Sequence, residues 1–416
     1  MDNESARKTR EVLRNREFGF FLSTRFILIF SLFMQNTVLG YWMYQLTNNP
    51  LSLGLIGLAE VIPAFGLAFI AGYFVDHRVK RNVYLSCIGF YVLNALLMLY
   101  LASSFGKELF SVQHLEWMIY LVMFFSGCIR AFLAPASFSL LPLLIRKDQI
   151  PQAITWSSTA WMLGSVTGPL VAGMIMAYAG IFETLLVAAS FILISFFLIQ
   201  FIRPQPPVLK TDIGLLEGLK QGFRFVFKTE IILAVLSLDL FAVLFGGAEA
   251  LLPVFSKEIL HIGEVGYGWL RSAHGIGSLF LFLILTYIPL KKNIGIKLLL
   301  CILMYGLSML VFGLSEWFYL SFACLFFAGL FDGVSVVIRH SILQLNTPEE
   351  LKGRVSSINM MFISSSNELG AFESGLTARY LGAVRSVVLG GMLTMSVVGF
   401  TYWKAKSLRN MDMPEK

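Results

Sequence analysis

The chain has 416 residues, of which 57% are hydrophobic and only 14% are charged. A soluble domain usually carries about 25% charged residues, so this composition excludes an ordinary soluble globular protein. Apolar runs long enough to cross a bilayer recur along the whole length, for example at 185–202 and 298–314. The net charge of +7 does not indicate a nucleic-acid partner, because the basic residues gather in alternate loops between these runs. These features predict an all-α, polytopic membrane protein.

The first sixteen residues form a polar, basic tail that lacks the apolar core and cleavage site of a secretory signal. Apolar runs broken by glycine, proline and charge then predict about twelve spanning helices. Six fall in an N-terminal bundle at 17–202 and six in a C-terminal bundle at 231–404, followed by a tail at 405–416. The expected centres of the spans are Phe30, Ala64, Ala95, Cys128, Ser165, Phe191, Leu244, Leu279, Met304, Ala328, Ser365 and Met395.

Positive charge alternates from loop to loop. Basic residues occur in the N-terminal tail, after the second, fourth and eighth spans, and at the C-terminus: Arg7, Lys8, Arg10, Arg14, Arg16, His77, Arg78, Lys80, Arg81, Arg146, Lys147, Lys291, Lys292, Lys404, Lys406 and Arg409. The intervening loops, such as 103–117, carry few. Because positively charged loops stay in the cytoplasm, both termini are expected inside.

The longest polar interruption, at 203–230, separates the two predicted bundles. Within it the apolar residues share one helical face and the polar residues the other: Leu215, Leu216, Leu219, Phe223, Val226 and Phe227 against Glu217, Lys220, Gln221, Arg224 and Lys228. This pattern predicts an amphipathic helix on the cytoplasmic membrane surface, and we favour a structural strap over a binding site.

The two halves resemble each other at an offset of about 202 residues. At this offset Arg130 aligns with Asp332. Three small residues align with identical residues: Ser139 with Ser341, Gly168 with Gly370, and Gly173 with Gly375. Together with equal numbers of spans on either side of the linker, the matches predict a parallel duplication, an arrangement known from transporters.

The stretch "GYFVDHRVKR", at 72–81, resembles the loop signature of the major facilitator superfamily. Gly72, Asp76, Lys80 and Arg81 match the signature, whereas His77 and Val79 depart from it. The stretches "YQLTNNPLSLGLIGLAEVIP" and "FDGVSVVIRHSILQLNTPEELKGRVSSINMMF" are similar to the drug and siderophore exporters of that family. The resemblance implies a twelve-span transporter whose two pseudo-symmetric six-helix bundles alternate access to a central site.

The resemblance also assigns a gating role to the matched loop, with Gly72, Asp76, Lys80 and Arg81. In this fold Asp76 is expected to meet the first turn of the eleventh span, where Arg354 lies, when the cytoplasmic side is closed. The N–H groups and partial positive charge of a helix start favour such a carboxylate.

Charged residues inside predicted spans are the candidates for proton coupling. A charge at the bilayer centre costs about 2.5–3.5 kcal/mol, so each should face protein or water and carry a task. The coupling candidates are Glu60, Arg130, Asp239, Glu249 and Asp332. Glu60 is a candidate partner for Arg130, since the second and fourth spans are neighbours in this fold. Asp239 and Glu249 lie about 15 Å apart along a continuous helix, and therefore at different depths.

A second group of residues is expected to line a water-filled cavity or to join helices through polar contacts. The group combines two amides of the first span with polar residues of the eleventh: Gln35, Asn36, Asn359, Asn367, Glu368 and Glu373. His274 and His340 stand alone in the sequence, and no nucleophile triad, metal-ligand cluster or phosphate loop is recognisable. The sequence therefore favours no enzyme, no metal and no cofactor.

The function that fits best is proton-driven export of an amphipathic small molecule, drug-like or a siderophore, by a monomer in a bacterial inner membrane. One alternative is an importer of a siderophore complex or a lysolipid on the same fold. The other is a membrane receptor or scaffold that transports nothing.

The charge asymmetry makes a testable prediction about topology. A cysteine introduced in place of Lys210, in the linker, should react with a membrane-impermeant maleimide only after the cytoplasmic face is exposed. A cysteine in place of Ser111, in a loop with little positive charge, should react from the outside. Labelling of position 210 from the outside would contradict the predicted topology.

Overall fold

A computed structural model describes residues 10–206, 215–287, 293–348 and 351–409. These residues form helices and connecting turns and no strand, which confirms the predicted all-α fold class. Several residues on which the topology depends lie outside the described ranges, namely Arg7, Lys8, Lys210, Lys291, Lys292 and most of the C-terminal tail.

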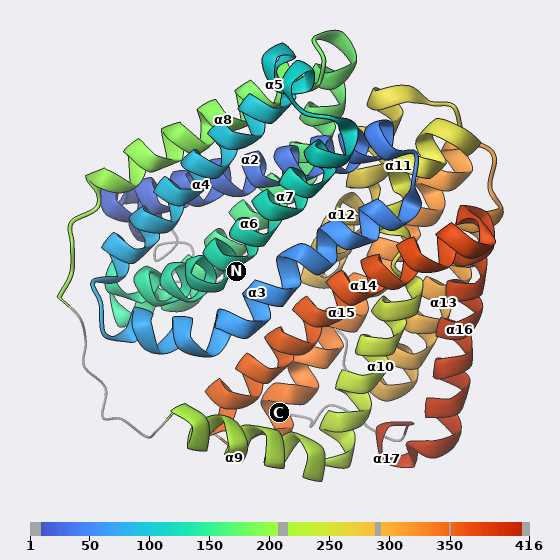
Figure 1. Ribbon diagram of the computed structural model, residues 1–416. Coiled ribbons are helices and arrows are strands. Elements are labelled where there is room, and N and C mark those ends of the chain that lie inside the picture. The colour runs from blue at the N-terminus through green and yellow to red at the C-terminus, as the bar shows by residue number, and fades with distance from the viewer. Residues whose placement is uncertain (1–9, 207–214, 288–292, 349–350, 410–416) are drawn as a thin grey trace. The chain divides into compact units, whose positions relative to one another are not determined.

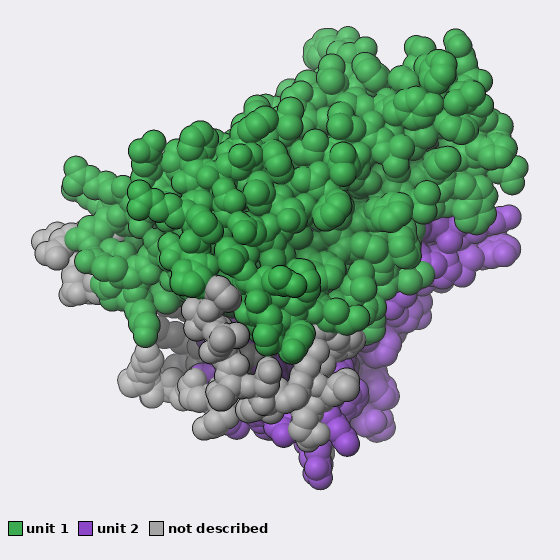
Figure 2. Space-filling view, turned by 60° about the vertical axis from the view of Figure 1, so that its left-hand side comes forward, with its two compact units in different colours: residues 1–47, 59–211 green, residues 48–58, 212–416 purple. Residues whose placement is uncertain are grey.

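The described chain forms two compact units, coloured separately in Figure 2. The first unit comprises residues 1–47 and 59–211, and the second comprises 48–58 and 212–416. The boundary falls within one helix, whose first turns belong with the second unit while the remainder belongs with the first.

The long helices of the first half follow in the order expected from the sequence (Figure 1): α2 (Arg16–Thr47), α3 (Pro50–Asp76), α4 (Lys80–Ala102), α6 (Val112–Leu140), α7 (Ile150–Tyr178) and α8 (Ile181–Leu198). A short helix α5 (Ser104–Leu109) joins α4 to α6. The hydroxyl groups of Ser103 and Ser111 accept hydrogen bonds from the first turns of α5 and α6, as helix caps do.

The second half begins with α9 (Leu215–Lys228) and continues with the long helices α10 (Glu230–Gly246), α12 (Gly263–Tyr287), α13 (Ile294–Leu314), α14 (Phe318–Asn346), α15 (Lys352–Leu381) and α16 (Ala383–Lys404). The chain leaves α10 through the short elements η4 (Ala248–Leu251), α11 (Leu252–Val254) and η5 (Phe255–Ile259), and ends in α17 (Lys406–Arg409). Figure 1 shows α9 lying across the ends of α10 and α15.

Eleven helical segments in the described part of the chain are long and apolar enough to cross a membrane. The eleventh expected span, α15, has 30 residues but is not among them, because polar residues interrupt its apolar sequence. Such residues are tolerated in a spanning helix when they face protein or water rather than lipid.

Helix packing repeats between the two units. In the first unit α2 packs on α7 and α8, and α4 packs on α6 and α8. In the second unit the corresponding helices pair in the same way, α10 with α15 and α16, and α13 with α14 and α16. The predicted duplication therefore appears in the tertiary contacts as well as in the sequence.

Glycines explain why the repeat is visible in the sequence. Gly168 packs against the backbone of α2 and its counterpart Gly370 against the backbone of α10, so closely that an added Cβ would lie 2.6 Å and 2.8 Å from a carbonyl oxygen. Gly180 and Gly382 link the last two helices of each unit at φ +105° and +85°, a backbone region that favours glycine. Both pairs are about 202 residues apart, the offset predicted from the sequence.

A third glycine pair brings helices together beside charged residues. An added Cβ on Gly127 of α6 would overlap the carbonyl oxygen of Glu60 on α3. An added Cβ on its counterpart Gly329 of α14 would overlap the carbonyl oxygen of His274 on α12. Small residues at such positions let membrane helices approach closely.

Gly329→Ala should therefore separate α12 from α14 and lower the thermal unfolding midpoint of the purified protein. Overpacking of this kind costs about 1–3 kcal/mol. Gly399→Ala is the matched control, since an added Cβ there meets no atom within 4 Å. Equal midpoints for the two variants would contradict the close α12–α14 contact.

Candidate functional site

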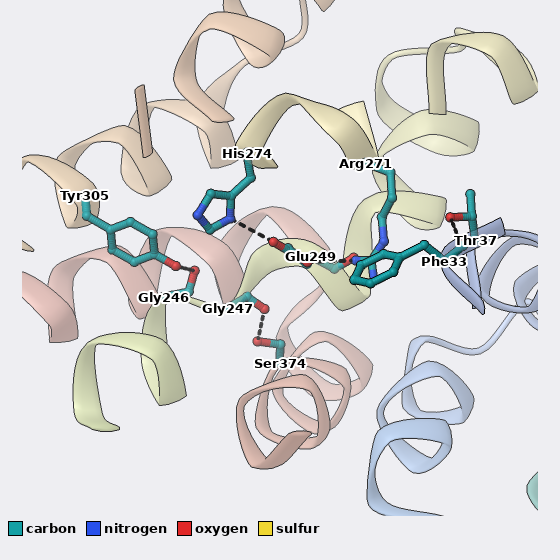
Figure 3. A network of polar contacts seen from close by, with 9 residues as sticks. All are labelled: Phe33, Thr37, Gly246, Gly247, Glu249, Arg271, His274, Tyr305 and Ser374. Carbon is teal, nitrogen blue, oxygen red and sulfur yellow. Dashed lines mark hydrogen bonds and ion pairs between the residues drawn. The ribbon is translucent and has the colours of Figure 1, made fainter. Parts of the chain in front are cut away.

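The candidate site lies in the second unit, where the seventh span is broken. The sequence predicted one continuous helix through 239–249, but α10 ends at Gly246, and a 3₁₀ turn begins at Ala248. The hydroxyl of Tyr305 donates to the carbonyl oxygen of Gly246 at 3.1 Å, and that of Ser374 to Gly247 at 3.0 Å (Figure 3). Backbone groups freed at depth in a membrane need such partners, so α13 and α15 stabilise the break.

The break turns Glu249 toward α12. Its carboxylate accepts a hydrogen bond from the guanidinium of Arg271 at 3.0 Å and contacts Nδ1 of His274 at 2.8 Å (Figure 3). Arg271 also donates to the backbone oxygen of Glu249 at 3.3 Å. Arg271 and His274 are three positions apart on α12 and therefore share one helical face.

His274 connects Glu249 to a second carboxylate. Its other ring nitrogen, Nε2, lies 3.4 Å from an oxygen of Asp332 on α14. The expectation that His274 stands alone is therefore wrong. A neutral imidazole has one N–H, so only the doubly protonated ring can donate to both carboxylates.

The cluster of Glu249, Arg271, His274 and Asp332 carries an unbalanced charge unless it holds a proton. One guanidinium and two carboxylates sum to −1 with a neutral imidazole and to zero with an imidazolium. Glu368 of α15 interacts electrostatically with Arg271 and adds a further negative charge nearby. Binding of a proton thus reduces excess negative charge where such charge is expensive.

The side chains of the cluster are partly exposed. The side chain of Glu249 is 45% exposed and that of Asp332 is 30% exposed. Those of Arg271 and His274 are each 23% exposed. The cluster is thus less enclosed than the Asp239–Arg339 pair, whose side chains are 8% and 3% exposed.

Asp239 belongs to a different environment. It forms an ion pair with Arg339 of α14, and the two side chains are 8% and 3% exposed. The sequence named Asp239 as a coupling candidate without naming this partner. Burial of both members fits a structural pair that joins α10 to α14 better than a group that exchanges protons with water.

In the first unit Arg130 contacts Glu60 at 3.2 Å, the partner that the sequence named as a candidate. Glu60 is 9% exposed and Arg130 is 40% exposed. This pair is the counterpart of His274–Asp332, because Gly127 beside it and Gly329 beside His274 occupy equivalent close contacts. The signs are exchanged: the base lies on α6 in the first unit, and the acid lies on α14 in the second.

The predicted cavity-lining residues divide into three groups. Gln35 and Asn359 are buried, and their side-chain oxygens accept no hydrogen bond within the described residues. Asn36 and Asn367 are exposed. Glu368 and Glu373 are half-buried on α15.

Residues of the predicted gating loop are held largely by backbone oxygens. Lys80 donates to the carbonyl oxygens of Val75 at 2.8 Å and of Asp76 at 2.5 Å, which closes the end of α3. Arg81 donates to the carbonyl oxygens at positions 200 and 202. Gly72 is half-buried and Asp76 exposed, while Arg354 contacts Gln221 of α9. The contact of Asp76 with the first turn of α15 stays a prediction.

Sequence reasoning missed Arg271, and it also missed Arg25. Arg25 of α2 donates to the hydroxyl of Ser137 at 2.6 Å and to the carbonyl oxygen of Ser157 at 3.1 Å, and so joins α2 to α6 and α7. Both arginines interrupt apolar sequence, and that interruption is the signal that could have identified them. No cluster of metal-ligating residues occurs in the described part of the chain.

Two units of membrane-length helices with repeated packing are the architecture of a membrane transporter. The chain belongs to the Major Facilitator Superfamily, whose family model matches residues 21–371. Among its relatives is the enterobactin exporter EntS of Escherichia coli O1:K1, 24% identical over 341 residues, which cover 80% of this chain and 78% of the exporter. The exporter of Shigella boydii serotype 18 matches equally well.

Solved structures with the same fold include a POT family transporter in complex with 5-aminolevulinic acid, with a TM-score of 0.73 and 12% identity over 95% of this chain and 97% of that one. A bacterial homologue of the human lysosomal transporter Spinster, in an inward-facing and unoccupied conformation, has a TM-score of 0.73 and 13% identity. That match covers 97% of this chain and 100% of the homologue.

The Asp239–Arg339 pair makes a prediction that separates structure from transport. Arg339→Met should leave a buried, unpaired carboxylate and reduce the unfolding free energy by about 3–5 kcal/mol. The double variant Asp239→Leu, Arg339→Met removes both charges and should recover most of that loss, as measured by thermal unfolding in detergent. Equal losses in the single and double variants would contradict a structural role for the pair.

Proposed function

We propose that this transporter exports an amphipathic small molecule, a siderophore or a drug-like compound, from the cytoplasm of a bacterium in exchange for protons. The distant similarity to enterobactin exporters supports export and this class of substrate. It also supports a position in the bacterial inner membrane. The assignment of the proton as the coupling ion rests on the chemistry of the site.

The observation that carries the proposal is the position of His274 between the carboxylates of Glu249 and Asp332. An imidazolium there neutralises the four-residue cluster, and its loss restores a net negative charge. A transporter that exchanges substrate for protons needs a group whose protonation changes the relative stability of two conformations. The partly exposed cluster supplies such a group without any cofactor.

Coupling then follows from charge balance. With the proton bound, the cluster can be closed off from water at a low electrostatic cost. Without the proton, its excess negative charge favours a conformation in which water or a substrate reaches it. Glu60 and Arg130, the counterpart pair in the first unit, carry a balanced charge and would serve to hold α3 against α6.

The test uses everted membrane vesicles with an acidified lumen and iron-free enterobactin as the probe, while pyranine reports lumenal pH. We expect uptake of enterobactin together with loss of lumenal protons. His274→Gln and Glu249→Gln should reduce both signals to the level of vesicles without the transporter. His114→Gln and Glu108→Gln, which change an exposed histidine and an exposed glutamate, should leave both signals intact.

Two outcomes would overturn the proposal. Full gradient-driven transport by both His274→Gln and Glu249→Gln would remove the cluster from coupling. Accumulation of the probe only in right-side-out vesicles would indicate import rather than export. Thermal unfolding of each variant distinguishes loss of coupling from loss of the fold.

A further inference from the structure

One face of helix α9 packs against its own unit. Val226 is fully buried in a cluster with Ile232, Leu236, Leu343, Val355 and Ile358. On the same face, an added Cβ on Gly222 would lie 2.9 Å from the side chain of Ile358. This face holds α9 against the beginnings of α10 and α15.

Next to this face lie two aromatic residues, of which Phe223 packs partly against the same cluster and Phe227 is exposed. Phe223 and Phe227 are stacked with ring centroids 6.3 Å apart. The sequence placed Phe227 and Val226 on one apolar face; Val226 is buried against the protein, whereas Phe227 is 58% exposed. The amphipathic pattern is therefore wider than the area that the protein itself buries.

A basic face follows directly around the helix. Lys220, Arg224 and Lys228 occur at every fourth position and are all exposed. Within the described residues none of the three forms an ion pair, and Glu217 is the single acid of α9. An exposed aromatic ring beside a row of cations is a feature of a helix that lies in the interface of an anionic membrane.

We propose that α9 binds anionic phospholipids of the cytoplasmic leaflet. The connection to α10 argues for lipid over a soluble anion. Only Thr229 separates α9 from α10, so the C-terminal turn of α9 lies at the membrane surface, where that span begins. Phe227 then enters the boundary between headgroups and acyl chains, and Lys220, Arg224 and Lys228 contact headgroup phosphates.

The lipid contact reaches α15 through direct bonds. Gln221 accepts a hydrogen bond from Arg354 in the first turn of α15, next to the contact between Gly222 and Ile358. Anionic lipid that holds α9 should therefore also stabilise the cytoplasmic end of α15. This inference does not depend on the substrate or on the coupling ion.

The test is hydrogen–deuterium exchange of the full-length protein in nanodiscs of phosphatidylcholine alone or mixed with equal parts of phosphatidylglycerol. Each cation near an anionic surface contributes about a fivefold preference, so exchange at 216–228 and 352–360 should slow by about fivefold or more in the mixed discs. High salt should remove the difference, since it screens exposed charges.

Matched variants make the test specific. The triple variant Lys220→Gln, Arg224→Gln, Lys228→Gln should show the same exchange in both kinds of disc. The control Lys107→Gln, Arg379→Gln, Arg385→Gln removes three exposed cations elsewhere and should keep the difference. If the triple variant unfolds at lower temperature than the wild type, the single variant Arg224→Gln takes its place. It should lose part of the difference in exchange between the two kinds of disc.

Three results would overturn the inference. The first is equal exchange of the wild type in both kinds of disc. The second is a retained difference in the triple variant. The third is that soluble glycerol phosphate, added to discs of phosphatidylcholine alone, slows exchange in α9 as much as phosphatidylglycerol does. That result would indicate a phosphate site unrelated to lipid.

Discussion

A lipid bilayer offers no partner for a charge or for a free backbone group, and this constraint organises the second unit of the protein. The break after Gly246 would leave carbonyl oxygens without partners, yet Tyr305 and Ser374 satisfy them. Because of the break, Glu249 points in a different direction than it would on a continuous helix, and its carboxylate reaches Arg271 and His274. One local departure from helical geometry thus assembles side chains from α12 and α14, with supporting hydroxyls from α13 and α15.

The internal repeat shows how one scaffold can hold two kinds of charge pair. Gly127 and Gly329 place equivalent helices in backbone contact, and each contact carries a charged pair beside it. Glu60–Arg130 joins one acid to one base, whereas His274–Asp332 belongs to a larger cluster that also contains Glu249 and Arg271. The two units therefore share the packing of these helices but differ in the charged groups beside it.

The charged residues of the second unit differ more in their exposed fraction than in their residue type. Asp239 and Arg339 are both enclosed, and their mutual contact replaces the water that each has lost. Glu249 and Asp332 stay partly accessible although both belong to membrane-spanning segments. The two carboxylates of the second environment are thus less enclosed than the Asp239–Arg339 pair.

The sequence by itself determined the class of fold, the order of the spans and the duplication, because these depend on local composition and on periodicity along the chain. The family followed from the resemblance of the 72–81 loop to a known signature. It also identified most of the intramembrane charges, since each interrupts an apolar run. The tertiary structure alone decided which charges meet. His274 appeared isolated because its partners Glu249 and Asp332 lie on other segments, and Asp239 gave no sign of Arg339 a hundred residues away. Pairing across helices depends on crossing points and on the break in α10, and neither leaves a periodic signal in the sequence.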